Sequence, residues 1–395
     1  MSALFIPPWA QRVDAIAPFR VMELLDKAKQ LERAGRDIVH MEIGEPDFVT
    51  PQAIIAAAEQ ALKQGKTHYT PALGLPELRE AIAEHYQTRY GLNIHPQRIV
   101  ITAGGSGALL LAAALLINPG QSLLMTDPGY PCNRHFLQLV GAESILVPVK
   151  AEDDYALTPA LAKQYWQQNT CGMLLASPAN PTGGILSQQQ LKGLAELTRE
   201  RRAWMIVDEI YHGLCYGNAV PTALSCHDEA IVINSFSKYY GMTGWRLGWM
   251  VLPEALLPGV EKLAQNYFIA PPTLAQYAAL AAFDAAAQAE MEERRQAFQA
   301  RRDFLLPALR ELGFRIDHPP QGAFYLYANA KAFTEDSYSF CSNLLEHVGV
   351  AITPGIDFGV QQAEQFVRFA YTTSLPRLQE GVERLAAFLQ KNRHG

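Results

Sequence analysis

The stretch "RIVITAGGSGALLLAAALLINPGQSLLMTDP", residues 98–128, shows the pattern that decides the predicted fold. A short apolar run is followed by a helical run rich in alanine and leucine, and then by a second apolar run. The alternation continues toward the C-terminus, with further strand-like segments at residues 143–149, 171–178, 203–209 and 229–237. Short apolar strands that alternate with helices predict an α/β domain in which a mostly parallel sheet lies between helices.

The segments on either side of this pattern predict a second domain. Residues 53–65 and 76–90 have the apolar spacing of amphipathic helices, and a proline introduces each of them. After about residue 275 the pattern changes to a long helical region, which mixed strand-like and helical segments follow. We expect a large domain at residues 46–280 and a smaller α+β domain that combines the N-terminal arm, residues 1–45, with residues 281–395.

The composition limits the partners that are expected. The 395 residues carry a net charge of −6 and no block of basic residues, so neither nucleic acid nor a membrane surface is an expected partner. The five cysteines are scattered without C-x-x-C spacing, which predicts neither disulfides nor a metal site and favours the cytoplasm. The N-terminus lacks the segments of a signal peptide, and the most apolar stretch, "ALLLAAALLIN", is too short to span a bilayer.

Residues at the carboxyl ends of the strands are candidates for a binding site, because ligands of such sheets bind there. Gly105, Ser106 and Gly107 lie between a strand and a helix, where backbone N–H groups and the helix dipole favour an anion such as phosphate. Tyr130 follows the next strand and can stack on a flat ligand. An ordinary glycine turn and a core or turn tyrosine are the alternatives.

Two later strand ends carry an amide and a carboxylate. Asn180 is held between prolines, and the Asn180–Pro181 bond is a candidate cis peptide; a plain turn is the alternative. Asp208 ends a strand that has no other ionisable group, and Tyr211 follows three residues later. The alternatives are a helix N-cap at Asp208 and a surface role for Glu209.

The last strand-like segment is followed by Ser235, Ser237 and Lys238, then by a glycine-punctuated turn and Arg246. Neither cation has a carboxylate nearby in sequence, and an exposed lysine is the alternative. Together the strand ends offer an anion cradle, an aromatic plate, a carboxylate for a ring cation, hydroxyl and amide donors, and a lysine that can form an imine. Pyridoxal phosphate, a phosphorylated pyridine aldehyde, uses all of these groups, so the pattern predicts this cofactor.

Five stretches resemble the class I and II aminotransferases, the aspartate-aminotransferase-like branch of the fold type I pyridoxal-phosphate enzymes. In chain order they are "GEPDFVTP", "YTPALGLPELREAIA", "SPANPTGG", "VDEIY" and "SFSKYYGMTGWRLGW". The resemblance extends from about residue 12 to residue 375. It implies a large domain with a sheet of the seven-stranded type. It also implies ping-pong transfer of an amino group, through a Schiff base, from an L-amino acid to a 2-oxo acid, which in this family is usually 2-oxoglutarate.

The resemblance also implies roles for the strand-end residues. Lys238 would form the Schiff base and then move a proton between the substrate's Cα and the cofactor. Asp208 would pair with the pyridine nitrogen, Tyr211 and Asn180 would bond the ring 3′ oxygen, and Tyr130 would stack on the ring. The phosphate would lie against the backbone N–H groups of Gly105, Ser106 and Gly107 and the side chains of Ser235, Ser237 and Arg246.

The substrate's α-carboxylate requires a cation of its own. The segment "FVRFAYTTS" resembles the arginine strand of the family, which nominates Arg368, with the backbone N–H of Gly44 as a second donor. An exposed strand charge is the alternative for Arg368. A tyrosine at the position of Tyr69 reaches the phosphate of the neighbouring subunit in this family, which implies a homodimer with active sites at the subunit interface.

Several alternatives remain open at this stage. The same fold serves C–S β-lyases, aminocyclopropane-type synthases and decarboxylases, and also non-catalytic pyridoxal-phosphate-binding regulators. A regulator is disfavoured because no basic helix pair precedes residue 40. The amino donor is not determined. Arg20 is a candidate partner for a dicarboxylic donor, whereas an apolar or aromatic pocket has six candidates, each with core packing as its alternative: Phe19, Tyr69, Tyr267, Phe268, Phe324 and Phe358.

Overall fold

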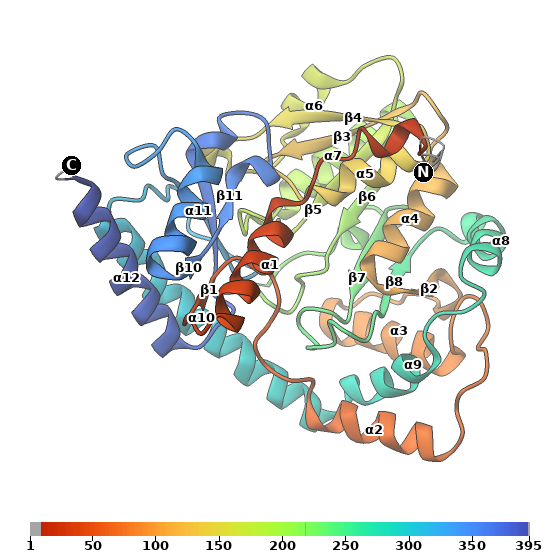
Figure 1. Ribbon diagram of the computed structural model, residues 1–395. Helices are drawn as coiled ribbons and strands as arrows, with labels where there is room; N and C mark the ends of the chain where they lie inside the picture. Colours follow the sequence, from red (N-terminus) through yellow and green to blue (C-terminus); the bar gives the residue numbers. More distant parts are fainter. Residues whose placement is uncertain (1–8, 218, 394–395) are drawn as a thin grey trace, which may run out of the picture.

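The computed structural model describes residues 9–217 and 219–393, and a seven-stranded sheet lies at its centre (Figure 1). In chain order the strands are β2 (Ile99–Thr102), β3 (Ser122–Asp127), β4 (Glu143–Pro148), β5 (Thr170–Ala176), β6 (Trp204–Asp208), β7 (Ile231–Ser235) and β8 (Gly248–Val251). Their order across the sheet is β2-β8-β7-β6-β5-β3-β4. β8 is antiparallel to both neighbours and the remaining pairs are parallel, so the predicted mostly parallel α/β sheet is confirmed.

Helices cover both faces of the sheet because the strand residues alternate between two hydrophobic clusters. On one face Val100 and Ile233 pack with α4 (Gly104–Leu116), α5 (Cys132–Leu139) and α8 (Leu257–Tyr267). On the other face Ile101 and Val232 pack with α3 (Pro76–Tyr90), α6 (Pro159–Tyr165) and α7 (Gln188–Arg201). Burial on both faces explains why these strands appear in the sequence as continuous apolar runs.

The helices predicted before and after the sheet are present. Those expected at 53–65 and 76–90 are α2 (Gln52–Lys63) and α3. The long helical region consists of α9 (Thr273–Leu280), which lies against α2, and α10 (Ala285–Leu312). In Figure 1, α10 extends from beside α2 to the C-terminal part of the chain, where it packs against α12.

The sequence analysis did not predict β8, which begins just after the glycine-punctuated turn and Arg246. A Cβ atom at Gly248 would lie 2.8 Å from the backbone carbon of Gly104 and 2.9 Å from the nitrogen of Gly105. Only a glycine therefore lets the start of α4 lie directly on β8. This close approach places the first turn of α4 beside the residues that follow β7.

The C-terminal part contains a second, smaller sheet with the order β11-β12-β9, formed by β9 (Tyr325–Asn329), β11 (Thr353–Pro354) and β12 (Phe366–Ala370). α11 (Ser337–Val348) packs against β11 and β12, and α12 (Leu375–Arg393) packs against α10 and α11. The N-terminal segment joins this part: β1 (Val39–His40) pairs in parallel with β10 (Val350–Ala351). In Figure 1, α1 (Arg20–Arg33), drawn in red, lies beside the blue strands β10 and β11.

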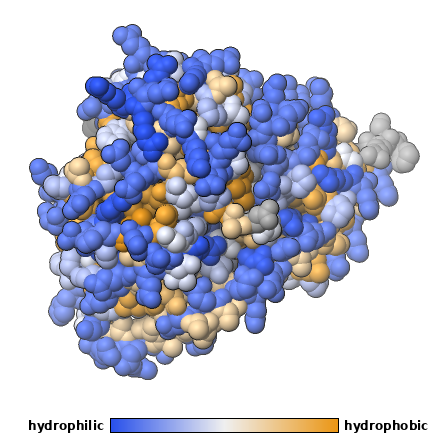
Figure 2. Space-filling model, turned by 180° about the vertical axis from the view of Figure 1, so that it is seen from behind, coloured by the Kyte–Doolittle hydropathy of each residue, from blue (hydrophilic) through white to orange (hydrophobic). Residues whose placement is uncertain are grey.

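On the rear face of the molecule, which Figure 2 shows, polar side chains cover most of the surface and apolar patches lie between them. Within the described residues, no helix is both long and apolar enough to cross a membrane. All five cysteines are unpaired.

Candidate active site

One cavity of about 330 Å³ lies where the carboxyl ends of β6 and β7 face the small sheet. Twelve of the predicted site residues line it: Gly44, Gly105, Ser106, Tyr130, Asn180, Asp208, Tyr211, Ser235, Ser237, Lys238, Arg246 and Arg368. They come from strand ends far apart in the sequence, which the parallel topology brings to one edge. Gly107, which is buried in α4, and Tyr69 do not line this cavity.

Lys238 lines the cavity, three residues beyond β7. Its Nζ donates a hydrogen bond to the backbone oxygen of Gly44, at 2.6 Å. Burial lowers the pKa of Lys238 to about 8; the cations of Arg368 and Arg246 act in the same direction, while Glu45 and Asp208 oppose it. An amine with this pKa is partly neutral near pH 7, as a nucleophile or a general base must be.

Asp208 is the last residue of β6 and is 8% exposed. Its Oδ1 accepts the backbone N–H of Ile210 at 3.0 Å. Burial raises the pKa of Asp208 to about 6, although that hydrogen bond and the charge of Lys238 lower it. A cationic ligand atom beside this carboxylate would offset the cost of burying its charge.

Two alternatives for this strand end are wrong. The residues after Asp208 form turns and not a helix, so Asp208 is not a helix N-cap. Glu209 is 1% exposed, not a surface residue, and accepts hydrogen bonds from Thr222 Oγ1 at 3.0 Å and from the N–H of Ala223 at 2.7 Å. Glu209 therefore ties the end of β6 to residues 222 and 223.

The wall of the cavity near the start of α4 carries hydroxyls, backbone N–H groups and a guanidinium. α4 begins at Gly104, so the N–H groups of Gly105 and Ser106 lie in its first turn without a helical partner. Ser235 Oγ donates to Ser237 Oγ at 3.0 Å, and Arg246 donates to the oxygen of Thr243 at 2.9 Å. These groups form an anion site with the chemistry of a phosphate cradle.

Close packing at this anion site depends on one glycine. A Cβ atom at Gly104 would lie 2.6 Å from Arg246 Nη2. Arg246 itself has a φ of 53°, a left-handed conformation that is uncommon outside glycine. The chain holds the Arg246 guanidinium against the start of α4 in spite of that conformation, which fits a functional position for it.

Arg368, on β12, is 3% exposed, so its alternative as an exposed strand charge is wrong. Its Cζ lies 4.2 Å from the ring centroid of Tyr325 and 4.7 Å from that of Phe358. Its Nη groups donate to Asn180 Oδ1 at 3.0 Å, to Thr353 Oγ1 at 3.2 Å and to the backbone oxygen of Glu42. Its buried Nε has no partner within the described residues. This caged cation with an unused donor suits a carboxylate ligand.

Asn180 and Gly44 lie beside this arginine. The Asn180–Pro181 peptide is cis, as the sequence suggested. Because Asn180 Oδ1 accepts from Arg368, its amide nitrogen remains available to donate to a ligand. A Cβ atom at Gly44 would lie 1.9 Å from the hydroxyl of Tyr325, so this position requires glycine.

Some of the remaining candidate residues line the cavity, and others lie outside it. Tyr69 is 79% exposed. Arg20 forms an ion pair with Glu23 and lies over the ring of Tyr338, so it does not supply a cation to the cavity. Of the aromatic candidates Phe19 lines the cavity, Phe358 covers Arg368 and Phe324 is a core residue, while Tyr267 and Phe268 lie outside the cavity.

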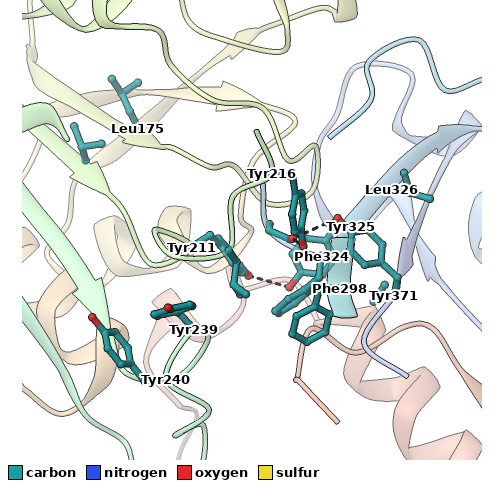
Figure 3. Packing of buried hydrophobic residues seen from close by; sticks show 14 of the residues in the cluster. Leu175, Tyr211, Tyr216, Tyr239, Tyr240, Phe298, Phe324, Tyr325, Leu326 and Tyr371 are labelled. Carbon is teal, nitrogen blue, oxygen red and sulfur yellow. Dashed lines mark hydrogen bonds between the residues drawn. The ribbon is translucent and has the colours of Figure 1, made fainter. Parts of the chain in front are cut away.

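Sequence reasoning missed two contributions to the site. Tyr325 lines the cavity, and its hydroxyl lies 2.9 Å from that of Tyr211, as the dashed line in Figure 3 shows. Sequence reasoning named Phe19 for a pocket but not the helix that follows it: Val21 and Met22 of α1 also line the cavity, and Asp357 accepts the N–H groups of Arg20 and Val21 at 3.0 and 2.8 Å. The alternating segment "FYLYAN" could have indicated a strand with a tyrosine at its start, but no local pattern indicates the contact of α1 with residue 357.

The donor set fits pyridoxal phosphate. A partly neutral amine, a buried carboxylate and an anion cradle share one cavity, and these are the partners of an aldehyde, a pyridinium nitrogen and a phosphate. Within the described residues, no cluster of histidine, cysteine or acidic side chains is arranged to hold a metal ion. The fold and these residues together define the class as fold type I pyridoxal-phosphate enzymes.

Comparisons with known proteins identify the family. The family model "Aminotransferase class I and II" matches residues 36–385. A valine–pyruvate aminotransferase of Mycobacterium tuberculosis is 39% identical over 95% of this chain and 97% of its own, and an aspartate aminotransferase of Geobacillus stearothermophilus is 34% identical over 96% and 98%. The chain belongs to the class I and II aminotransferases and to their aspartate-aminotransferase-like branch.

Comparison with solved structures supports the same family assignment. The crystal structure of an aminotransferase from Mycobacterium tuberculosis has a TM-score of 0.94 and 38% identity, and the alignment covers 98% of this chain and 100% of that one. An aspartate aminotransferase from Thermus thermophilus with maleate has a TM-score of 0.92 and 33% identity, with 97% and 100% covered.

Arg368→Lys is expected to weaken substrate binding more than turnover. Lysine keeps the charge but loses the planar fork, so the KM for an amino donor should rise by about 10- to 100-fold, with kcat changed much less. Steady-state kinetics measures both constants. The matched control is Arg377→Lys, which changes an arginine paired with Asp37 and Glu380 outside the cavity and should leave both unchanged. A KM within twofold of the wild-type value for Arg368→Lys would contradict this assignment.

Proposed function

We propose that this enzyme binds pyridoxal phosphate as a Schiff base with Lys238 and transfers an amino group from an L-amino acid to a 2-oxo acid. The observation that carries the proposal is the position of Lys238, whose buried amine shares one cavity with Asp208, Arg246 and Arg368. Each of these groups matches one part of the cofactor or of an amino acid. Domain bounds of 46–280 for the cofactor part, and of 1–45 with 281–395 for the part that supplies Arg368, belong to the same proposal.

The proposed role of each residue follows from its place in the cavity. When bound, pyridoxal phosphate supplies an aldehyde for the substrate's amine and a ring that accepts electrons. Asp208 would hold the ring nitrogen protonated, and Tyr130 would pack on the ring. Arg368 would orient the α-carboxylate, together with the N–H of Gly44, so that the Cα–H bond faces Lys238. Lys238, once free, would take that proton and deliver it to the cofactor, because a pKa of about 8 leaves part of the amine neutral.

The phosphate would be held by the first turn of α4 and its surroundings. Backbone N–H groups of Gly105 and Ser106, two serine hydroxyls and the Arg246 guanidinium supply donors at that end of the cavity. We also include the N–H group of Gly107 in the proposed phosphate site, although Gly107 lies further along α4 and does not line the cavity. A dianion at these donors would fix the position of the ring relative to Lys238 and Asp208.

The cavity favours amino donors with apolar side chains. Among the described residues that line it, the cations are Lys238, Arg246 and Arg368, and each already has a role. The remaining wall includes seven apolar side chains: Phe19, Val21, Met22, Ile43, Leu109, Ala176 and Ile210. The name of the mycobacterial relative, a valine–pyruvate aminotransferase, agrees with such a donor, whereas other relatives are named for aspartate. We keep 2-oxoglutarate as the proposed acceptor, with pyruvate as its competitor.

A homodimer with shared active sites belongs to the proposal. Tyr69 lies outside the cavity of its own chain, where it is free to reach the phosphate of a second protomer. Other large apolar side chains are also exposed, among them Val49, Leu62, Tyr267 and Ile269. A monomer in sedimentation equilibrium would contradict the dimer. The five unpaired cysteines support the proposed cytoplasmic location.

A panel of amino donors against 2-oxo acids tests the function. Purified holoenzyme is incubated with valine, leucine, phenylalanine, aspartate or glutamate and with 2-oxoglutarate or pyruvate, and each product is quantified. We expect a new amino acid and a new 2-oxo acid in equal amounts, and kcat/KM at least about tenfold higher for the best apolar donor than for aspartate. Pyruvate with ammonia and no new amino acid would show a lyase. No turnover with any pair would support a regulator.

The pH dependence of cofactor capture follows from Lys238. Only a neutral amine attacks an aldehyde, and a lysine with its pKa lowered to about 8 becomes neutral as the pH rises through that value. The rate at which the apoprotein binds pyridoxal phosphate covalently should therefore rise with pH and level off above about 8. Stopped-flow absorbance over pH 6 to 10 measures it. A rate that keeps rising to pH 10 would show an ordinary lysine, with a pKa of roughly 10.4.

A further inference from the structure

Tyr325 is a cavity residue to which the mechanism above gives no role. It begins β9, is 1% exposed and pairs in register with Ala370 of β12. Arg368 lies two residues away on that same strand. Tyr325 thus belongs to the small sheet that carries the carboxylate-binding arginine. In Figure 3 its hydroxyl points toward Tyr211, which comes from the loop after β6.

The hydroxyl of Tyr325 contacts Tyr211, the residue proposed to bond the ring oxygen of the cofactor. The two phenol oxygens of Tyr325 and Tyr211 are 2.9 Å apart, and their rings pack edge to face with centroids 5.8 Å apart. Burial raises the pKa of both phenols, so both keep their protons at neutral pH. A phenol has one proton to donate. If Tyr211 donates its proton to a ligand, Tyr325 must be the donor between the two tyrosines.

The ring of Tyr325 contacts Arg368, the residue proposed to bind the substrate's carboxylate. The Arg368 guanidinium lies over that ring and over the ring of Phe358, with its carbon 4.2 Å from the Tyr325 centroid. Such a cation–π contact holds a guanidinium in place without using any of its donors. The Tyr325 hydroxyl also lies beside Gly44, whose oxygen accepts from Lys238. One side chain therefore touches the surroundings of the cofactor, of the substrate and of the lysine.

We propose that Tyr325 is a positioning residue that links the two halves of the site. Its hydroxyl donates to Tyr211 and so commits the Tyr211 proton to the cofactor's ring oxygen, while its ring holds Arg368 ready for the substrate's carboxylate. Hydroxyls in a chain polarise one another, so Tyr211 becomes a stronger donor when Tyr325 donates to it. The proposal rests on the proposed function, since it requires a ring oxygen and a carboxylate at these places.

Tyr325→Phe separates the hydroxyl from the ring. A hydrogen bond donated to the cofactor's ring oxygen favours the deprotonated form of that oxygen. Weakening this donor should raise the pKa of the visible absorbance of the holoenzyme by about 0.5 to 1 pH unit. Tyr211→Phe should cause a larger shift in the same direction. Because phenylalanine keeps the ring over Arg368, the KM for the amino donor should stay within about twofold of the wild-type value.

Tyr325→Leu removes the ring as well. Arg368 then loses the surface on which it lies, so the KM for the amino donor should rise by about tenfold in addition to the spectral shift. The matched control is Tyr327→Phe on the same strand. Tyr327 stacks on Phe366 with centroids 4.7 Å apart and does not line the cavity, so this variant should match the wild type in absorbance and KM.

The outcomes distinguish the possibilities. If Tyr325→Phe titrates like the wild type while Tyr211→Phe shifts, the hydroxyl positions nothing and the link is absent. If Tyr325→Leu binds substrate like the wild type, the ring does not hold Arg368. Should the leucine variant fail to fold, the spectral titration of Tyr325→Phe alone decides. Failure of the proposed function looks different, because the wild type itself would then bind no pyridoxal phosphate and show no visible absorbance to titrate.

Discussion

Lys238→Ala is expected to lower kcat/KM by about 10⁴-fold or more, since it removes both the Schiff-base amine and a proton-transfer group, and the latter alone is worth about 10² to 10⁴. The fold should survive, because within the described part of the chain the amine hydrogen-bonds only to the oxygen of Gly44 and alanine fits the space. The variant should still bind pyridoxal phosphate non-covalently through Asp208 and Arg246. Single-turnover kinetics with an amino donor measures the loss.

Two further measurements make the Lys238 result specific. Lys262→Ala changes an exposed lysine on α8 and should retain wild-type activity. A small primary amine added to Lys238→Ala should restore part of the activity, because it can replace the missing base in the space left by the side chain. Activity of Lys238→Ala within tenfold of the wild type would mean that another group carries the chemistry.

Asp208→Asn is expected to reduce kcat by on the order of 10³-fold, because an amide cannot stabilise the charge that a protonated ring nitrogen carries in the transition state. Binding of the cofactor should weaken much less, since the anion cradle at the start of α4 is untouched. Asparagine has nearly the same shape and can still accept the N–H of Ile210, so the strand end should keep its conformation. Cofactor titration and steady-state kinetics measure the two effects separately.

The control for Asp208 is an aspartate outside the cavity. Asp228→Asn changes an exposed aspartate that pairs with Arg98, and kcat should not change. If Asp208→Asn lost cofactor and activity in equal measure, its carboxylate would serve in binding only. If the variant kept kcat within tenfold of the wild type, the ring nitrogen would have another partner.

Much of the fold could be predicted because its signal is local. Strands buried on both faces are apolar along most of their length, and six of the seven strands of the central sheet could be recognised from their apolar runs. β8 was missed although its four residues are apolar and buried, because it directly follows the glycine-punctuated turn and its place depends on the contact of Gly248 with the start of α4. α1 was also missed. Phe19 provides no side-chain cap, and the carboxylate of Asp357, 337 residues from Arg20, supplies the hydrogen bonds instead.

The part of the site that depends on the topology of the central sheet could be predicted. Parallel strands end at one edge of a sheet, so the residues that follow β5, β6 and β7 had to lie close together. Arg368 was reachable only through the resemblance to a family, since nothing in the large part of the chain indicates which strand of the small sheet faces the cavity. Tyr325 was not reachable, because its contact with Tyr211 joins residues 114 positions apart.

The central claim is that Lys238 holds pyridoxal phosphate covalently, and one measurement tests it directly. The holoenzyme is reduced with borohydride, digested, and its peptides are mapped by mass spectrometry. We predict that the phosphopyridoxyl group is found on Lys238, within the peptide that contains "SFSKYYG", and that no other lysine carries it in comparable amount. A label on a different lysine, or a reduced protein without any label, would contradict the account.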